Sequence, residues 1–240
     1  MCSAEGRLPW ACGCSTPKPP HAVGVFTEDE GDGAVAIYHL HASIIGRSDG
    51  RSAVAAAAYR AGQSVACRET GDTHDYTRKG GVVSAEVIAP DAAPAWATDR
   101  AALWNAVHAK ETRKNSQLAR EVRVALPHDL TDAEAAEMLR AWVRAEFVDR
   151  GMIADVCVHD PDPEDEDDSR NRHAHILLTM RPLDPTQPDG WAKNKDRTWN
   201  APDTLDRWRA SWAEAQNAAL ARAGSSARVD HRSLADQRAA

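Results

Sequence analysis

The chain has 240 residues, of which 42% are hydrophobic, and its formal net charge at pH 7 is −7. This length and apolar content are enough for one large domain with a buried core. No apolar run approaches the ~18 residues of a membrane span, and the first residues lack the charged start and apolar stretch of a secretory signal. We therefore expect a soluble, cytoplasmic protein without membrane insertion.

The acidic net charge does not exclude a nucleic-acid partner, because the charges are unevenly distributed. Acidic residues concentrate in 28–32 and in 160–168. Basic residues cluster elsewhere, at Arg78 and Lys79, at Arg113 and Lys114, and in 193–197. Local patches set the affinity for phosphate more than the total charge does, so the net charge decides nothing about the partner.

The N-terminal part of the chain divides into a leader, a strand and a helix. Residues 1–34 are rich in Pro, Gly and Cys and show no periodicity, so we expect a flexible leader before a domain that spans 35–240. The pattern of 35–45 predicts a strand. The alanine-rich segment 51–63 predicts a helix, with Ser48 or Asp49 as its N-cap.

Further along the chain, strand and helix patterns alternate. Strands are predicted at 82–88, 121–126, 154–159 and 174–180. Helices are predicted at 98–114, 131–148 and 203–223. Thr131 and Glu134 have the spacing of a capping box at the start of the second of these helices. Five strands interrupted by helices indicate an α+β fold with one main sheet.

Two histidines introduce the last predicted strand. His173 and His175 alternate on this strand, so their side chains share one face, with Cα atoms about 6.5–7 Å apart. Both imidazoles can then converge on one cation, whereas on a helix they would diverge. His159 ends the preceding strand and becomes a third candidate if the chain returns as the adjacent antiparallel strand. Three imidazoles without a thiolate suit a divalent metal that keeps positions open for a substrate oxygen.

The spacing alone leaves a second interpretation open, in which these are surface or hydrogen-bonded histidines at strand ends. His39 and His41 show the same spacing on the first predicted strand, without an equally placed third ligand. We expect this pair to be structural or to contact DNA.

The chain has only three tyrosines, Tyr38, Tyr59 and Tyr76. Tyr59 lies late in the alanine-rich helix, and a tyrosine among alanines is usually an anchor in the core. Its small neighbours would also let a bulky substrate approach the hydroxyl. The residues alone favour the core interpretation.

Several longer segments resemble, in the same order, those of the MobA/MobL relaxases of the MobQ class. They are AIYHL at 36–40, GRSAVAAAAYR at 50–60, HDYTRKGG at 74–81, NSQLARE at 115–121, ALP at 125–127 and NRHAHIL at 171–177. Residues 230–233 resemble a motif that follows the nuclease core in that family. The resemblance covers about residues 35–235.

The resemblance implies an HUH-endonuclease-like fold, with a central antiparallel sheet of about five strands flanked by helices. It places Tyr59 at the position of the nucleophile and Glu121 at that of a carboxylate beside the site. His173 and His175 match the paired histidines, and His159 matches the third metal ligand. The implied cofactor is a divalent metal ion, Mn²⁺ or Mg²⁺ in the first place and Zn²⁺ as a further candidate.

The implied function is that of a plasmid mobilisation relaxase, a metal-dependent enzyme that nicks one strand of transfer-origin DNA through a 5′-phosphotyrosine intermediate and later rejoins it. The implied partners are single-stranded and hairpin DNA at the origin, relaxosome accessory proteins and a type IV coupling protein. Trp191 and Trp199 either stack on bases or belong to the core. Two alternatives stay open: a rolling-circle replication initiator, and a degenerate single-stranded DNA-binding module without catalysis.

Three features depart from the family pattern. Residues 1–34 precede the strand at which relatives usually begin. Arg123 stands where a second acidic residue is expected. The loop 160–172 is longer and more acidic than the usual glycine-containing loop, and we expect a solvated insertion rather than a metal contact.

Overall fold

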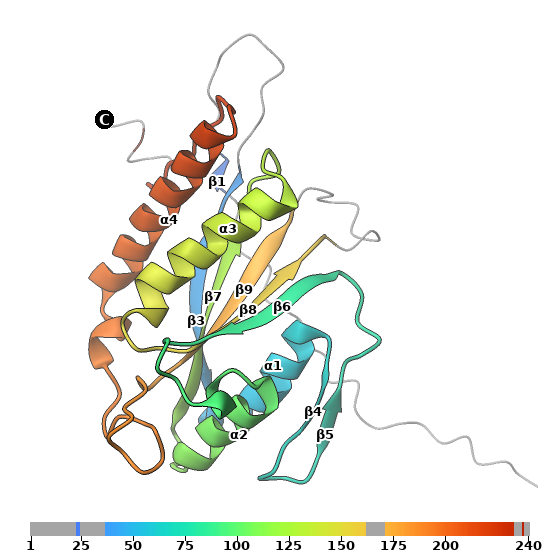
Figure 1. Ribbon diagram of the computed structural model, residues 1–240, viewed down its shortest axis with the longest axis vertical. Coiled ribbons are helices and arrows are strands. Elements are labelled where there is room, and N and C mark those ends of the chain that lie inside the picture. Colours follow the sequence, from blue (N-terminus) through green and yellow to red (C-terminus); the bar gives the residue numbers. More distant parts are fainter. Residues whose placement is uncertain (1–22, 25–36, 162–170, 233–236, 238–240) are drawn as a thin grey trace, which may run out of the picture.

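The structure is a computed structural model that describes residues 23–24, 37–161, 171–232 and 237 (Figure 1). Its centre is a five-stranded antiparallel sheet with the strand order β3-β7-β9-β8-β6. In that order the strands are Leu40–Gly46, Gln117–Ala125, His173–Thr179, Ala154–His159 and Val82–Ile88. β8 and β9 are adjacent, so the chain does return after His159 as the antiparallel neighbour.

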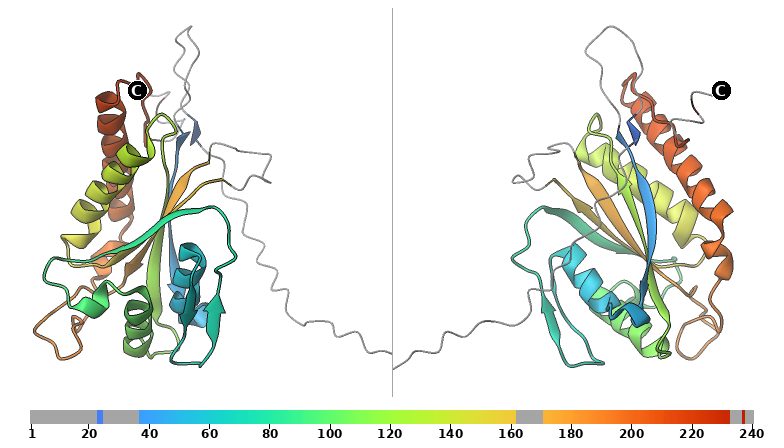
Figure 2. Two further views of the ribbon diagram at one scale, coloured as in Figure 1. Left: turned by 45° about the vertical axis from the view of Figure 1, so that its right-hand side comes forward. Right: turned by 180° about the vertical axis from the view of Figure 1, so that it is seen from behind.

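Helices cover both faces of the sheet, as the two views in Figure 2 show. On one face lie α3, Asp132–Val143, and α4, Pro202–Arg222. On the other lie α1, Ala53–Ala61, and α2, Arg100–Lys110. Each face has its own core cluster, because alternate residues of a strand point to opposite faces. No helix in the described part of the chain is long and apolar enough to cross a membrane.

The alternation along β9 decides which of its residues reach the site. Ala174, Ile176 and Leu178 belong to the core beneath α3 and α4. His173 and His175 therefore face the side of α1 and α2, and Leu177 packs in the core on that side. α1 and α2 lie over the lower part of the sheet in Figure 1, so the upper end of this face is less covered. His173 is the first residue of β9 and His175 the third.

The first predicted strand and helix are present with changed boundaries. The segment 35–45 forms β2, Ile37–Tyr38, and β3. The predicted N-cap, Ser48 or Asp49, is wrong, because 47–49 form a separate 3₁₀ turn that ends at Gly50 with a φ of 66°. Ser52 is the N-cap of α1, and its side chain accepts a hydrogen bond from the Ala55 backbone.

The later helices and strands lie where the sequence pattern predicts them, although β7 begins at Gln117, before the predicted strand 121–126. The strands at 82–88 and 154–159 have the predicted limits. The capping box of Thr131 and Glu134 is confirmed at the start of α3. The predicted helix 131–148 changes at residue 144 into a π-helical turn, Arg144–Val148, in which Phe147 and Val148 are buried.

Two small features were not predicted. A hairpin of β4, Ser64–Ala66, and β5, Thr73–Asp75, follows α1, and its three-residue strands are too short for a periodic pattern. β1, Val23–Gly24, pairs with β2. The other residues of the expected leader lie outside the described part, as do 162–170 of the acidic loop, so both expectations stay predictions.

Candidate metal centre and nucleophile

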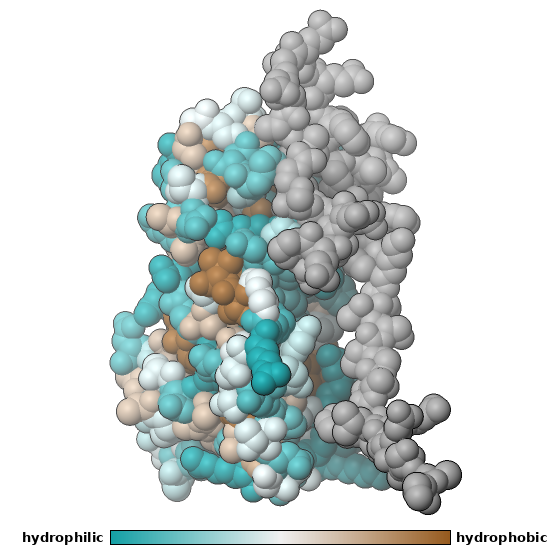
Figure 3. Space-filling model, turned by 90° about the vertical axis from the view of Figure 1, so that its right-hand side faces the viewer, coloured by the Kyte–Doolittle hydropathy of each residue, from teal (hydrophilic) through white to brown (hydrophobic). Residues whose placement is uncertain are grey.

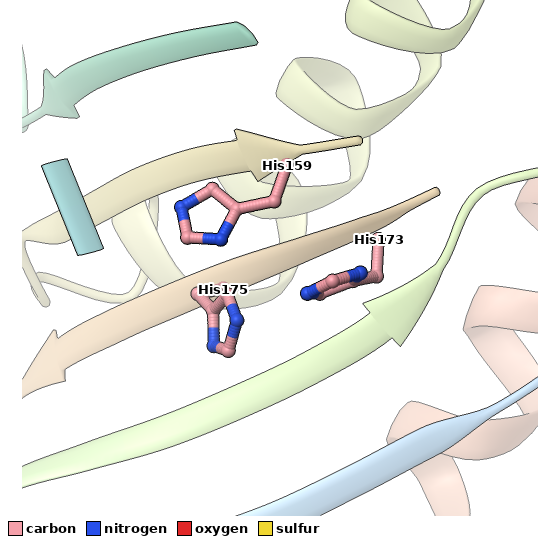
Figure 4. A group of neighbouring side chains, drawn as sticks. All are labelled: His159, His173 and His175. Atoms are coloured by element: carbon pink, nitrogen blue, oxygen red, sulfur yellow. The ribbon is translucent and has the colours of Figure 1, made fainter. Parts of the chain in front are cut away.

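Three histidines meet at one end of the sheet. His159 ends β8, and His173, opposite it in the register, begins β9 two residues before His175. The ring centroids of the three imidazoles are 4.9–5.6 Å apart, and one nitrogen from each ring lies within 4.8 Å of the others. Figure 4 shows the rings gathered on the same side of the two strands. The convergence predicted from the spacing is therefore present.

Backbone carbonyls fix the orientation of two of the rings. His159 Nε2 lies 2.6 Å from the Arg60 carbonyl oxygen, and His173 Nδ1 lies 2.8 Å from that of Asn171. A carbonyl oxygen only accepts, so each of these ring nitrogens donates its proton. The lone pair of a neutral imidazole then lies on the other nitrogen, Nδ1 of His159 and Nε2 of His173.

A carboxylate fixes the third ring. His175 Nδ1 lies 2.6 Å from Glu121 Oε1, which leaves Nε2 as the nitrogen with the lone pair. Glu121 is itself held by Arg60, whose Nε and Nη2 donate to its two oxygens at 2.7 and 2.6 Å. Burial alone would raise the pKa of Glu121, but the hydrogen bonds from His175 and Arg60 outweigh it and hold this pKa well below the ordinary value.

The imidazoles are neutral at physiological pH. Burial lowers the pKa of His159 and of His173 from the ordinary 6.5 to about 4, and the positive charges of neighbouring groups act in the same direction. Burial also lowers the pKa of His175, although the hydrogen bond to Glu121 opposes it. Only the neutral form of histidine binds a metal, so the site is prepared for one across the physiological range.

The donor set fits a divalent cation. Each of the three imidazoles has one nitrogen occupied by an oxygen acceptor, which is the arrangement that orients metal-binding histidines. The lone pair of His159 Nδ1 already accepts from a cationic group, because Lys79 Nζ lies 3.4 Å from it. The triad could thus hold a metal ion.

Tyr59 lies on α1 beside this centre. The core interpretation of Tyr59 is wrong, because the residue is 49% exposed. Tyr59 and Val83 of β6 are the two exposed large hydrophobic residues in the described part. The side of the molecule shown in Figure 3 is largely hydrophilic, with a hydrophobic patch near its middle. The Tyr76 ring packs edge-on against that of Tyr59 at 5.2 Å, and Lys79 Nζ lies 5.0 Å from the centroid of the Tyr59 ring. Lys79 therefore contacts both Tyr59 and His159.

Two residues of the site were missed by the sequence analysis. Arg60 holds Glu121 with its side chain and His159 with its carbonyl, and Lys79 connects Tyr59 to the triad. Both stand inside segments that carry the family resemblance, next to residues that were singled out. Arg60 lies in the last turn of α1, which ends at Gly62 with a φ of 60°, and Lys79 follows the β4–β5 hairpin.

The other aromatic candidates lie elsewhere. The Tyr38 hydroxyl is buried and donates to the Arg209 carbonyl of α4. Stacking of Trp191 or Trp199 on bases is contradicted, because these residues are 3% and 8% exposed and belong to the core clusters. His41 lies on β3, two strands away from His175, and is not part of the triad.

The sheet order, the histidine triad and the helix that carries Tyr59 together define an α+β fold of the HUH-endonuclease kind. The chain matches the MobA/MobL family over residues 51–240 and belongs to it. The predicted fold class and family are thereby confirmed.

Relatives in this family include mobilisation and conjugal transfer proteins. Over 228 residues the chain is 40% identical to the mobilization protein MobL of Acidithiobacillus ferridurans, covering 84% of this chain and 59% of that protein. It is 37% identical over 159 residues to the conjugal transfer protein TraA of Agrobacterium fabrum, covering 62% and 14%. It is 32% identical over 243 residues to a probable mobilization protein MobA of Bifidobacterium longum, covering 85% and 41%. The chain thus spans 59% or less of the length of these three relatives.

A solved structure is similar as well. It comes from work on the molecular basis of vancomycin resistance transfer in Staphylococcus aureus. The TM-score is 0.73 at 30% identity, and the match covers 82% of this chain and 99% of the solved chain.

Proposed function

We propose that this chain is the relaxase domain of a plasmid mobilisation protein, which nicks one strand of transfer-origin DNA and later rejoins it. The observation that carries the proposal is the exposed Tyr59 beside three histidines, each of which offers one ring nitrogen within 4.8 Å of the others. Family membership and the mobilisation and conjugal transfer proteins among its relatives support it.

The site has to overcome the repulsion between the anionic phosphodiester and an incoming nucleophile. A phosphodiester is anionic, and a phenol with a pKa near 10 is a weak nucleophile. A divalent metal held by His159, His173 and His175, Mn²⁺ or Mg²⁺ first and Zn²⁺ as the alternative, would offset the charge that builds on the phosphate oxygens. The histidines suit this role because they bring no negative charge of their own.

Tyr59 is the nucleophile in this proposal. Its oxygen bonds to phosphorus while the bond from phosphorus to the 3′-oxygen breaks, and the phenol proton passes to the departing oxygen through solvent. The products are a 5′-phosphotyrosine and a free 3′-hydroxyl, and the retained ester bond allows the strand to be rejoined. Lys79, in contact with Tyr59, adds a positive charge next to the reacting phosphate.

Glu121 and Arg60 are positioning residues rather than proton carriers. Both oxygens of Glu121 are engaged by Arg60, and one also accepts from His175. The depressed pKa of Glu121 keeps it ionised, so it orients His175 and does not donate a proton. In the proposed relaxosome the DNA partner is a single strand next to a hairpin, and accessory and type IV coupling proteins are the further partners.

The test is the covalent adduct. The protein is incubated with divalent metal and a tiled set of 3′-labelled single-stranded oligonucleotides from the DNA around its coding sequence. Wild type should form an adduct that survives denaturation, and Tyr59→Phe should not. Tyr76→Phe is the matched control, because it removes a hydroxyl from the ring that packs against Tyr59.

An adduct that persists in Tyr59→Phe, or that maps to another residue by peptide mass, would show the assignment to be wrong. DNA binding by the wild type without an adduct on any oligonucleotide would favour the degenerate binding module. Cleavage at a replication origin, with none at a transfer origin, would favour the replication initiator.

A further inference from the structure

A second group of basic side chains lies on the same face of the sheet as the triad. His41 of β3 is opposite Arg123 of β7, and Arg123 is opposite His175 of β9. Their neighbours Val122 and Val124 are buried beneath α3 and α4, so Arg123 points to the face that carries the histidines. The row therefore continues the site across the sheet, away from His159.

Arg123 has no acidic partner there. It forms no ion pair and no hydrogen bond among the described residues, whereas Arg60 of α1 is paired with Glu121. The positive charge of Arg123 acts on His39, His173 and His175 and lowers the pKa of each. An unpaired guanidinium among imidazoles is a site for an anion.

His39 adds a buried ring nitrogen without a partner. Its ring stacks on that of His41, with centroids 6.5 Å apart and an angle of 14° between the planes. Its Nε2 atom is buried and has no hydrogen-bond partner among the described residues. A buried polar atom without a partner costs free energy, which an oxygen acceptor would recover when the ring proton is on Nε2.

We propose that Arg123, His41 and His39 form a second phosphodiester subsite, which binds the backbone phosphate adjacent to the one that Tyr59 attacks. This inference rests on the proposed function. Arg123 lies one strand from His175, about 4.8 Å across the sheet, so an anion there would neighbour one at the triad. A guanidinium binds phosphate with two parallel hydrogen bonds, and imidazole N–H groups supply further donors.

The position of Tyr59 sets the direction of the strand. Tyr59 approaches the triad on the side of β8, through Lys79 and His159, and Arg123 lies on the opposite side of His175. In an in-line displacement the leaving oxygen departs opposite the nucleophile. The segment that ends in the new 3′-hydroxyl therefore lies toward β7 and β3. The subsite binds the first phosphate on the 5′ side of the cleaved linkage. It retains the cleaved segment for rejoining.

The first experiment measures affinity without cleavage. In a Tyr59→Phe background, the dissociation constant for a single-stranded oligonucleotide that wild type cleaves is measured by fluorescence anisotropy. Arg123→Gln should weaken binding about tenfold or more, as expected for the loss of a charge-assisted hydrogen bond to phosphate. The slope of log affinity against log salt should fall by about 0.7. Arg140→Gln is the matched control, because Arg140 lies on α3 and pairs with Glu86.

The second experiment locates the phosphate. One neutral methylphosphonate linkage replaces either the phosphate 5′ to the cleaved one or the phosphate 3′ to it. The 5′ replacement should weaken binding of Tyr59→Phe by a similar factor and have little further effect once Arg123→Gln is present. The 3′ replacement should weaken both proteins equally.

Equal affinity of Arg123→Gln and its parent, or coupling of Arg123 to the 3′ linkage instead, would overturn the subsite. Arg123→Lys, which keeps the charge, guards against a loss that comes only from misfolding, since it should retain part of the affinity. The outcome is separable from the proposed function, because wild type can form the Tyr59 adduct whether or not Arg123 contributes to binding.

Discussion

Arg60→Met is expected to damage both the stability of the domain and its metal site. The Arg60–Glu121 ion pair is nearly buried, with each side chain 11% exposed. Removal of one partner from a buried pair leaves an uncompensated charge and costs about 3–5 kcal/mol. For a domain of this size, that corresponds to a fall in Tm of about 6–20 °C. Met keeps the length and apolar character of the stem, so little of this loss comes from packing.

The same change loosens a metal ligand. Glu121 would keep only its bond to His175, and the pKa of Glu121 would rise as the Arg60 hydrogen bonds are lost. Complete loss of an outer partner of a ligating histidine lowers metal affinity by about 10–100-fold, so a Glu121 that is loosened but still bonded to His175 should lower it by about tenfold or less. Calorimetric titration with Mn²⁺ at a temperature where the variant is folded, together with urea unfolding, measures both effects.

A double variant distinguishes buried charge from metal orientation. In Arg60→Met/Glu121→Gln the unpaired charge is gone, so much of the stability should return, while the metal affinity stays low. Arg140→Met breaks an exposed pair with Glu86 and should change stability by about 1 kcal/mol or less. If Arg60→Met lost no more free energy of unfolding than Arg140→Met and bound Mn²⁺ as tightly as wild type, the reasoning would be refuted.

Three further predictions concern the triad, the leader and pH. His173→Ala or His175→Ala should abolish tight Mn²⁺ binding in calorimetry while His41→Ala preserves it, and equal binding by all three would argue against the triad. A chain without residues 1–34 should cleave DNA as the full chain does, and a large loss at equal folded fraction would place the leader in the site. In EDTA, the free energy of unfolding should decrease as pH falls from about 6.5 to about 4, because the unfolded chain protonates before His159 and His173, whose pKa values are lowered to about 4. Urea titrations across this range check the sign, and a flat or rising profile would contradict it.

The sheet could be predicted because its signals are local. The strands at 82–88 and 154–159 have continuous β-branched or apolar patterns, and their limits agree with the structure. The pairing of His159 with His173 followed from a single assumption, that the intervening loop returns the chain antiparallel. The β4–β5 hairpin could not be predicted in this way, because three residues are too few to show a period.

The groups that orient the metal ligands could not be predicted from residue types. Two of the three are backbone carbonyls, of Arg60 and Asn171, and any residue offers a carbonyl. The exposure of Tyr59 could not be predicted either, because the sequence of an alanine-rich helix with a tyrosine does not show whether another element covers the end of the helix. Both features are set by how α1 lies on the sheet.

The orientation of α1 couples the nucleophile to the metal site. Adjacent residues on a helix point about 100° apart, so Tyr59 and Arg60 cannot face the same way. Arg60 points into the sheet, where it is 9% exposed and holds Glu121, and Tyr59 consequently points outward and is 49% exposed. The carbonyl of Arg60 also fixes His159, so a rotation of α1 that moved the Tyr59 hydroxyl would disturb two metal ligands at once. Presentation of the nucleophile and orientation of the ligands are therefore one structural property of this helix.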